Sequence, residues 1–259
     1  MKNRIETLFA ERTEILSVFY TAGFPKRDDT VPIAICLEKA GVDLIEIGIP
    51  FSDPIADGPV IQDSNKIALS NGMTVGKLLE QVREIRKSVE LPIILMGYIN
   101  PLLQYGMKKF CEEAAMSGVD GVILPDLPMD EFEAEYKTLF HLHGLSNIFL
   151  ISPTTSVERI RKIDEATRGF IYAVSASSTT GAKGDFNPEQ KLYFKRLQNM
   201  KLRNPFLVGF GITNSQNFSE VCQYGAGAIV GSAFISMMKD SIDFKKDILH
   251  FVKALKGFG

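Results

Sequence analysis

A carboxylate stands in the middle of an apolar run at residues 44–49, LIEIGI. If this run is a strand, Glu46 shares one face with Leu44 and Gly48, while the three isoleucines occupy the other face. With the isoleucines packed beneath helices, Glu46 points into the interior near the strand's carboxyl end, where loss of water raises its pKa toward the range that suits proton transfer. The alternative role is a buried ion pair with a neighbouring strand, which perturbs a pKa in a comparable way.

Two further carboxylates, Asp53 and Asp57, lie in the loop that follows, PFSDPIADGP at residues 50–59. The prolines restrict the backbone, so the loop is able to hold a carboxylate in a defined place. Aspartate before proline or glycine is also ordinary turn chemistry. The residues alone therefore favour a structural role for both side chains.

Glycines near the carboxyl end of the chain have the composition of a phosphate site. Gly209 and Gly211 follow one apolar run, and Gly231 with Ser232 follows the next and opens a short apolar helix. Glycine lets backbone amides approach an anion, and a helix N-terminus adds unpaired N–H groups and a favourable dipole. Glycine at a strand end is often only a turn residue, but the position after two successive late strands favours phosphate binding.

The segment from Ser175 to Gly184, SASSTTGAKG, is rich in small hydroxyl residues and glycine. This composition suits a lid that closes over a substrate and excludes water. A mobile surface loop is the alternative, and the nearby glycines of the predicted phosphate site favour the lid.

These residues must be positioned by short runs of Ile, Val, Leu and Phe that alternate with segments of helical spacing. Such alternation predicts a parallel sheet covered by helices. Eight units in 259 residues favour a single-domain (β/α)8 TIM barrel over residues 1–259, with extra short helices at the N-terminus and after strands 2 and 8. An open doubly wound sheet is the alternative. The predicted strands are Ile15–Tyr20, Leu44–Ile49, Ile93–Tyr98, Val122–Leu124, Ile148–Ile151, Phe170–Val174, Phe206–Val208 and Ala228–Val230.

A weak internal repeat supports this organisation. The sequences AGVD at residues 40–43, SGVD at 117–120 and YGAG at 224–227 each stand just before a predicted strand. Gly41, Gly118 and Gly225 are expected to end helices in the left-handed conformation, which glycine adopts at little cost.

Composition narrows the classes of partner. The net charge of −2, with both signs interspersed, provides no basic stripe for nucleic acid or an anionic membrane surface. The first residues, MKNRIETLFAER, lack the apolar run of a secretion signal, and we expect a cytoplasmic protein. No cysteine pair has CxxC spacing, and the histidines fall on predicted outer helices, so no metal site is expected. The cysteines are Cys36, Cys111 and Cys222, and the histidines are His141, His143 and His250.

The segment IEIGIPFSDPIADGPVIQ, from Ile45 to Gln62, resembles the signature of the tryptophan synthase α subunit family. Further similar segments are spread over almost the whole chain. They are FYTAGFP at 19–25, LMGYINP at 95–101, GVILPDLP at 121–128, YAVSASSTTGA at 172–182 and GFGI at 209–212. This resemblance implies a lyase that splits indole-3-glycerol phosphate into indole and glyceraldehyde 3-phosphate, with no cofactor of its own.

The resemblance also assigns roles to residues. It makes Glu46 the acid-base group that acts on the glycerol hydroxyl, and Asp57 the group that binds the indole N–H, against the structural role that the residues alone favour for Asp57. The implied indole pocket contains Phe19, Met96, Tyr98, Ile123, Leu150, Tyr172 and Phe210. Thr180 is the implied lid residue, and the implied phosphate ligands are Gly181, Gly211, Gly231 and Ser232.

The family works as an α2β2 complex in which indole passes to a β subunit that carries pyridoxal phosphate. The matching interface positions are Asp53, Pro54 and Asn100. Ser178 and Thr179 depart from the glycine and aliphatic residue usual in the family, which affects expectations about lid closure. The competing functions are a stand-alone lyase that releases indole, another phosphate-binding barrel enzyme, and a regulatory subunit that has lost its chemistry.

Overall fold

The computed structural model describes residues 4–175 and 185–257. Across these residues, nine parallel strands form one sheet in the order β5-β4-β3-β2-β1-β9-β8-β7-β6. The strands are β1 (Ile15–Thr21), β2 (Leu44–Gly48), β3 (Ile93–Met96), β4 (Gly121–Ile123), β5 (Ser146–Ile148), β6 (Leu150–Ile151), β7 (Ile171–Val174), β8 (Phe206–Gly209) and β9 (Gly227–Val230).

The two edge strands of this order, β5 and β6, are separated in the chain by a single residue, Phe149. β5 pairs with β4, and β6 pairs with β7, so the continuous backbone that joins β5 to β6 closes the sheet into a ring. The N–H of Tyr172 on β7 donates to the Phe149 carbonyl at 3.0 Å, so the residue between β5 and β6 is itself bonded to β7. The predicted barrel is therefore confirmed and the open sheet is wrong. The prediction of one continuous fifth strand at 148–151 is also wrong, because one backbone segment changes partner at Phe149.

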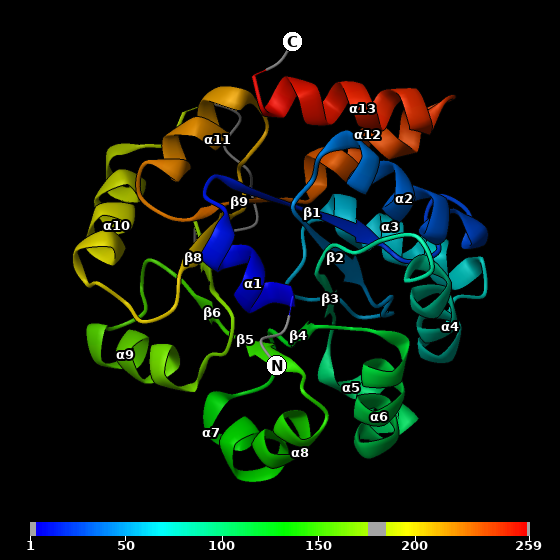
Figure 1. Cartoon of the computed structure of the whole chain (residues 1–259), viewed down its shortest axis with the longest axis horizontal. Helices are drawn as coiled ribbons and strands as arrows, with labels where there is room; N and C mark the ends of the chain where they lie inside the picture. Colours follow the sequence, from blue (N-terminus) through cyan, green and yellow to red (C-terminus); the bar gives the residue numbers. More distant parts are fainter. Residues whose placement is uncertain (1–3, 176–184, 258–259) are drawn as a thin grey trace.

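Helices surround this ring (Figure 1). The predicted extra helices are present as α1 before β1, α3 after β2 and α12 after β9. The α-helices are α1 (Arg4–Glu11), α2 (Thr30–Ala40), α3 (Pro59–Ser70), α4 (Val75–Ile85), α5 (Ile99–Tyr105), α6 (Met107–Ser117), α7 (Met129–Glu131), α8 (Lys137–Leu142), α9 (Val157–Ala166), α10 (Pro188–Asn199), α11 (Ser215–Cys222), α12 (Ser232–Asp240) and α13 (Phe244–Leu255), with the 3-10 helix η1 (Arg27–Asp29) and the π-helix η2 (Phe132–Tyr136). Within the described ranges, no helix combines the length and apolarity needed to cross a membrane.

The apolar side chains divide into two clusters. The larger cluster lies between strands and surrounding helices and includes Ile45 and Ile47 of β2. The smaller cluster fills the barrel and includes Leu44 from the opposite face of the same strand. Ile5 and Leu8 belong to the inner cluster, and Figure 1 shows α1 lying across the centre of the barrel. The alternation predicted for residues 44–49 is confirmed, and Glu46 lies on the inward side with Leu44.

Two of the three repeated segments end helices as predicted. Gly41 and Gly118 have φ values of 90° and 89° in the left-handed region, at the ends of α2 and α6. The prediction for Gly225 is wrong, because its φ is not positive and α11 ends before it. This position requires glycine for another reason: a Cβ would stand 2.6 Å from Cε2 of Phe206.

Candidate active site

Glu46 lies in the middle of β2 with no exposed surface. The hydroxyl of Ser17 on β1 donates to its Oε1 at 2.8 Å, and its Oε2 has no hydrogen-bond partner among the described residues. Burial raises the pKa of Glu46 to about 7, and the hydrogen bond from Ser17 opposes this effect. No basic side chain is paired with it in the described part of the chain, so the alternative of a buried ion pair is wrong. A carboxyl group with this pKa exchanges protons readily near neutral pH.

Asp57 lies in the loop between β2 and α3. Its N–H donates to the carbonyl of Pro54 at 3.1 Å, and the side-chain amide of Gln62 donates to its carbonyl at 2.8 Å. Its carboxylate accepts a hydrogen bond from the hydroxyl of Tyr98 at 3.0 Å. Burial raises the pKa of Asp57, and the bond from Tyr98 opposes the rise. The backbone thus makes the turn that the residues predict, and this turn presents the carboxylate to a tyrosine that follows β3.

Tyr172 on β7 has a pKa that responds to the charges of both carboxylates. Its pKa lies well above the ordinary value, first because the ring is buried, and then because the charges of Glu46 and Asp57 disfavour a phenolate. The phenol is therefore neutral at physiological pH. Its ring packs against Phe210 with the centroids 6.2 Å apart. The structure brings Glu46, Asp57, Tyr172 and Phe210 into one region of the barrel.

Other residues of the predicted indole pocket surround this region. Met96, Ile123, Leu150, Tyr172 and Phe210 all belong to the inner apolar cluster or pack against it. Phe19 is paired in register with Glu46 on the neighbouring strand. Tyr98 stands beyond the end of β3 and packs on Phe51, with ring centroids 5.3 Å apart.

Two glycines that the sequence analysis did not assign to the pocket make room for its rings. A Cβ on Gly48 would stand 2.7 Å from Cζ of Phe19, and a Cβ on Gly209 would stand 2.2 Å from the hydroxyl of Tyr172. Contacts this short are excluded for real side chains. Gly48 is recognisable from sequence, because it shares the strand face of Glu46, whereas the contact at Gly209 joins two strands and has no local signal.

Three of the predicted phosphate ligands, Gly211, Gly231 and Ser232, follow the carboxyl ends of the paired strands β8 and β9. Phe210 and Gly211 have φ values of 67° and 79°, so the chain turns sharply after β8. Ser175 stabilises this turn, since its hydroxyl donates to the Phe210 carbonyl at 2.6 Å. Gly231 directly precedes α12, which begins at Ser232 and presents its N-terminal N–H groups at the same side of the barrel. A Cβ on Gly231 would stand 3.4 Å from the ring of Phe19, which connects this helix end to the pocket.

Several predictions fall on residues outside the described ranges. These residues are Ser178, Thr179, Thr180 and Gly181. The predicted lid from Ser175 to Gly184 overlaps the same gap, and the structure describes only Ser175 of that segment.

The predicted partner positions differ in accessibility. Asp53 and Asn100 are exposed, whereas Pro54 is buried within the chain. The neighbouring Ile55 is 86% exposed, which is unusual for a large apolar side chain. Sequence reasoning missed Ile55, although an isoleucine between two turns in a polar loop could have indicated it.

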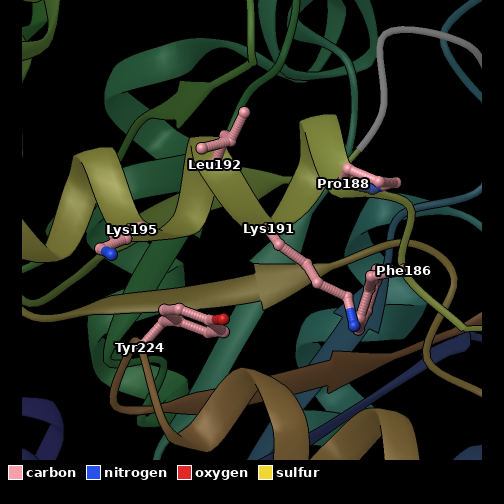
Figure 2. Close-up of a pocket in the computed structure, with 6 residues that line it drawn as sticks. All are labelled: Phe186, Pro188, Lys191, Leu192, Lys195 and Tyr224. Atoms are coloured by element: carbon pink, nitrogen blue, oxygen red, sulfur yellow. The ribbon is translucent and has the colours of Figure 1, made fainter.

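A surface hollow lies beside α10 (Figure 2). It is lined by Phe186, Pro188, Lys191, Leu192, Lys195 and Tyr224. Lys191 pairs with Glu220 at 2.6 Å, so this cation is already neutralised by the chain. None of the predicted catalytic or pocket residues lines the hollow. Across the described residues, no group of three or more His, Cys, Asp or Glu side chains is arranged to hold a metal ion.

A closed (β/α)8 barrel with titratable carboxyl groups, an aromatic pocket and a glycine-flanked helix end is typical of barrel enzymes that act on small phosphorylated molecules. A family model described as tryptophan synthase alpha chain matches residues 5–257. The chain belongs to this family, and it is a lyase of tryptophan biosynthesis that cleaves indole-3-glycerol phosphate.

Similar proteins cover nearly the full length. The tryptophan synthase alpha chain of Flavobacterium psychrophilum is 52% identical over 92% of this chain and 94% of its own. That of Christiangramia forsetii is 49% identical over 98% of both chains. Among solved structures, tryptophan synthase subunit alpha from Legionella pneumophila has a TM-score of 0.90 at 35% identity, covering 100% of this chain and 98% of its own. Tryptophan synthase from M. tuberculosis in an aminoacrylate-bound form has a TM-score of 0.86 at 28% identity and covers 98% of both chains.

Proposed function

We propose that Glu46 and Asp57 carry out the cleavage of indole-3-glycerol phosphate by acid-base catalysis. The observation that supports this most directly is the state of Glu46: a fully buried carboxyl group with a pKa of about 7 and one oxygen without a partner among the described residues. Ionised and protonated forms are then both well populated near neutral pH, which is the condition for efficient proton transfer.

The proposed reaction is a retro-aldol cleavage. A proton from solvent is added at C3 of the indole ring, and the positive charge that develops on the ring is stabilised at the N–H by the carboxylate of Asp57. Glu46 accepts the proton of the side-chain hydroxyl, whose oxygen becomes the aldehyde oxygen of glyceraldehyde 3-phosphate. The carbon–carbon bond breaks, its electron pair returns to the ring, and indole leaves. Glu46 then returns its proton to solvent, so the full reaction causes no net change in protons.

Substrate orientation is proposed to come from the two ends of the pocket. The rings of Phe210, which packs against the inner cluster, and of Phe19, which lies next to Gly231, would enclose indole, and the backbone amides at Gly211, Gly231 and Ser232 would bind the phosphate. The sharp turn after β8 and the start of α12 support this assignment, because both provide N–H groups on the mouth side of the barrel. Thr180 and Gly181 are proposed to complete the site from the lid.

The partner is proposed to be a β subunit in an α2β2 complex. Pyridoxal phosphate would belong to that subunit, and indole would pass to it. Exposed Asp53 and Asn100, together with the 86% exposed Ile55, support a contact at the loop that carries Asp57. The buried Pro54 would then shape this loop rather than contact the partner.

The test measures indole release from indole-3-glycerol phosphate by the purified chain, with and without a β subunit. Glu46→Gln and Asp57→Asn are each expected to lower kcat by about 10^2 to 10^4, with the larger loss for Glu46. The matched control is Glu84→Gln, the same substitution at an exposed ion pair on α4, which should leave kcat unchanged. Near wild-type turnover in Glu46→Gln would refute the assignment.

A second measurement concerns the phosphate. Gly231→Asp is expected to weaken the binding of a glycerol phosphate analogue because its carboxylate repels the anion, while the binding of indole alone changes little. Gly76→Asp on α4 is the control, since its Cβ meets no atom closer than 3.6 Å. Equal loss of both ligands would indicate a disturbed fold and argue against a phosphate site at α12.

The same assays separate the competing functions. A stand-alone lyase would release indole at full rate without a β subunit. A regulatory subunit without its own chemistry would accelerate the β reaction and release no indole. The buried carboxyl group of Glu46, whose Oε2 has no hydrogen-bond partner among the described residues, favours retained chemistry, because burial of a charge without function only reduces stability.

A further inference from the structure

Ser17 on β1 lies inside the barrel beside the proposed acid-base group. Its hydroxyl donates to Oε1 of Glu46 at 2.8 Å, and neither residue has exposed surface. We propose that Ser17 is a positioning residue, whose hydroxyl holds one carboxylate oxygen of Glu46 so that the other oxygen exchanges the proton with the substrate. This inference rests on the proposed catalytic role of Glu46.

The strand register explains why this contact forms. β1 and β2 are parallel, with Ser17 paired to Leu44 and Phe19 paired to Glu46. Ser17 and Phe19 are two residues apart, so both side chains lie on the inward face. Ser17 is the member nearer the amino end of the strand and therefore approaches the carboxylate from the side away from the barrel mouth. Oε1 is therefore held on the side toward the amino ends of the strands, and Oε2 is left without a partner among the described residues.

No other described polar group takes over this role. On β3, the residue paired with Glu46 is Ile94, and the next inward residue is Met96, so that side is apolar. Among the described residues, Tyr172 is a titratable group whose pKa the charge of Glu46 raises, so its phenol stays neutral and places no charge beside the carboxylate. The orientation of the carboxylate therefore depends on one hydroxyl.

The hydrogen bond also favours the ionised form of the carboxyl group. It opposes the effect of burial on the pKa of Glu46, which stands at about 7. A hydrogen bond to a charged group typically changes a pKa by about one unit or more. Without it, the carboxyl group would hold its proton to higher pH and would be less available to accept the proton of the substrate hydroxyl.

The experiment compares the pH dependence of kcat for the wild type and Ser17→Ala in the complete chain with its β subunit. The rising limb that reports ionisation of Glu46 is expected to move up by about 1 pH unit, so kcat at pH 6 falls roughly tenfold. KM should remain unchanged, because Ser17 is not placed in contact with the substrate. Ser17→Thr keeps the hydroxyl and is expected to restore the limb toward its wild-type position.

Ser64→Ala is the matched control. Ser64 is a buried serine on α3 whose hydroxyl bonds Thr21 at 2.6 Å, outside the catalytic region. Its loss tests the effect of removing any buried hydroxyl, and the pH profile of kcat should not move. A second readout that needs no turnover is the titration of the Glu46 carboxyl by carbon-13 NMR, with its resonance identified by its absence in Glu46→Gln.

The outcomes separate this inference from the proposed function. If Glu46→Gln retains near wild-type activity, the proposed role of Glu46 is wrong. If Glu46→Gln is inactive but Ser17→Ala has the wild-type pH profile and the wild-type titration of Glu46, the role of Ser17 is overturned and that of Glu46 stands. A shift seen equally in Ser64→Ala would also overturn it.

Discussion

The buried carboxyl group of Glu46 should make the protein less stable as the pH rises, and Glu46→Gln should remove this dependence. Burial raises its pKa from 4.5 to about 7 in the folded protein. Below pH 4.5 the group is protonated in both the folded and the unfolded state and makes no difference. Between these values the unfolded chain releases the proton while the folded chain keeps it, so the free energy of unfolding falls with rising pH and levels off above about 7.

The size of this effect follows from the same values. Raising the pKa from 4.5 to about 7 corresponds to roughly 3 kcal/mol of stability lost by pH 8. Glutamine has nearly the same shape and stays neutral, and its oxygen still accepts the bond from Ser17. Glu46→Gln should therefore match the wild type near pH 4.5 and exceed its stability by up to roughly 3 kcal/mol at pH 8.

Urea unfolding followed by circular dichroism, at a series of pH values from 5 to 8 for both proteins, measures the difference. The other titrating groups are shared and cancel. Glu84→Gln, at an exposed ion pair, should show no pH-dependent gain. A difference between Glu46→Gln and the wild type that stays constant with pH would refute the reasoning, since it would mean that the carboxyl group is not desolvated.

Two further predictions concern packing and charge. Gly209→Ala should destabilise the protein by about 1–3 kcal/mol and lower kcat, because its Cβ would stand 2.2 Å from the Tyr172 hydroxyl. In a double-mutant cycle followed by urea unfolding, Tyr172→Val should offset part of this loss of stability. Additive effects of the two substitutions would contradict the contact. Asp43→Ala should lower the free energy of unfolding by about 3 kcal/mol, because it leaves the buried N–H of Leu16 on β1 without its acceptor. Arg12→Ala removes the ion-pair partner of Asp43 and should cost less than about 1 kcal/mol, because the Arg12 side chain is 61% exposed. Equal losses of stability for the two variants in urea unfolding would contradict this.

Local patterns predicted much of the framework. The alternation of residues 44–49 indicates the inward direction of Glu46, because side chains along a strand point to opposite faces with period two. Gly41 and Gly118 are recognisable as helix ends, because the left-handed conformation is a property of one residue and its immediate neighbours. The alternation of strands and helices likewise predicts the parallel barrel.

Other features depend on contacts between distant segments. The carboxylate of Asp57 is held by Tyr98, a residue 41 positions later in the chain, so the loop sequence alone indicated only a turn. Gly225 is required by the ring of Phe206, although its place in the repeat predicted a helix end. The pairing of Ser17 with Glu46 has the same character, because it joins β1 to β2.

The sequence by itself determined which side chains of residues 44–49 lie on which face of their strand and where two of the repeated helices end, because these depend on the periodicity and conformation of neighbouring residues. Only the tertiary structure decided which strands meet at Phe149 to close the ring and which groups surround the two carboxylates. It also decided the pKa of Glu46, because desolvation and hydrogen bonding come from residues that folding brings together from separate strands and helices.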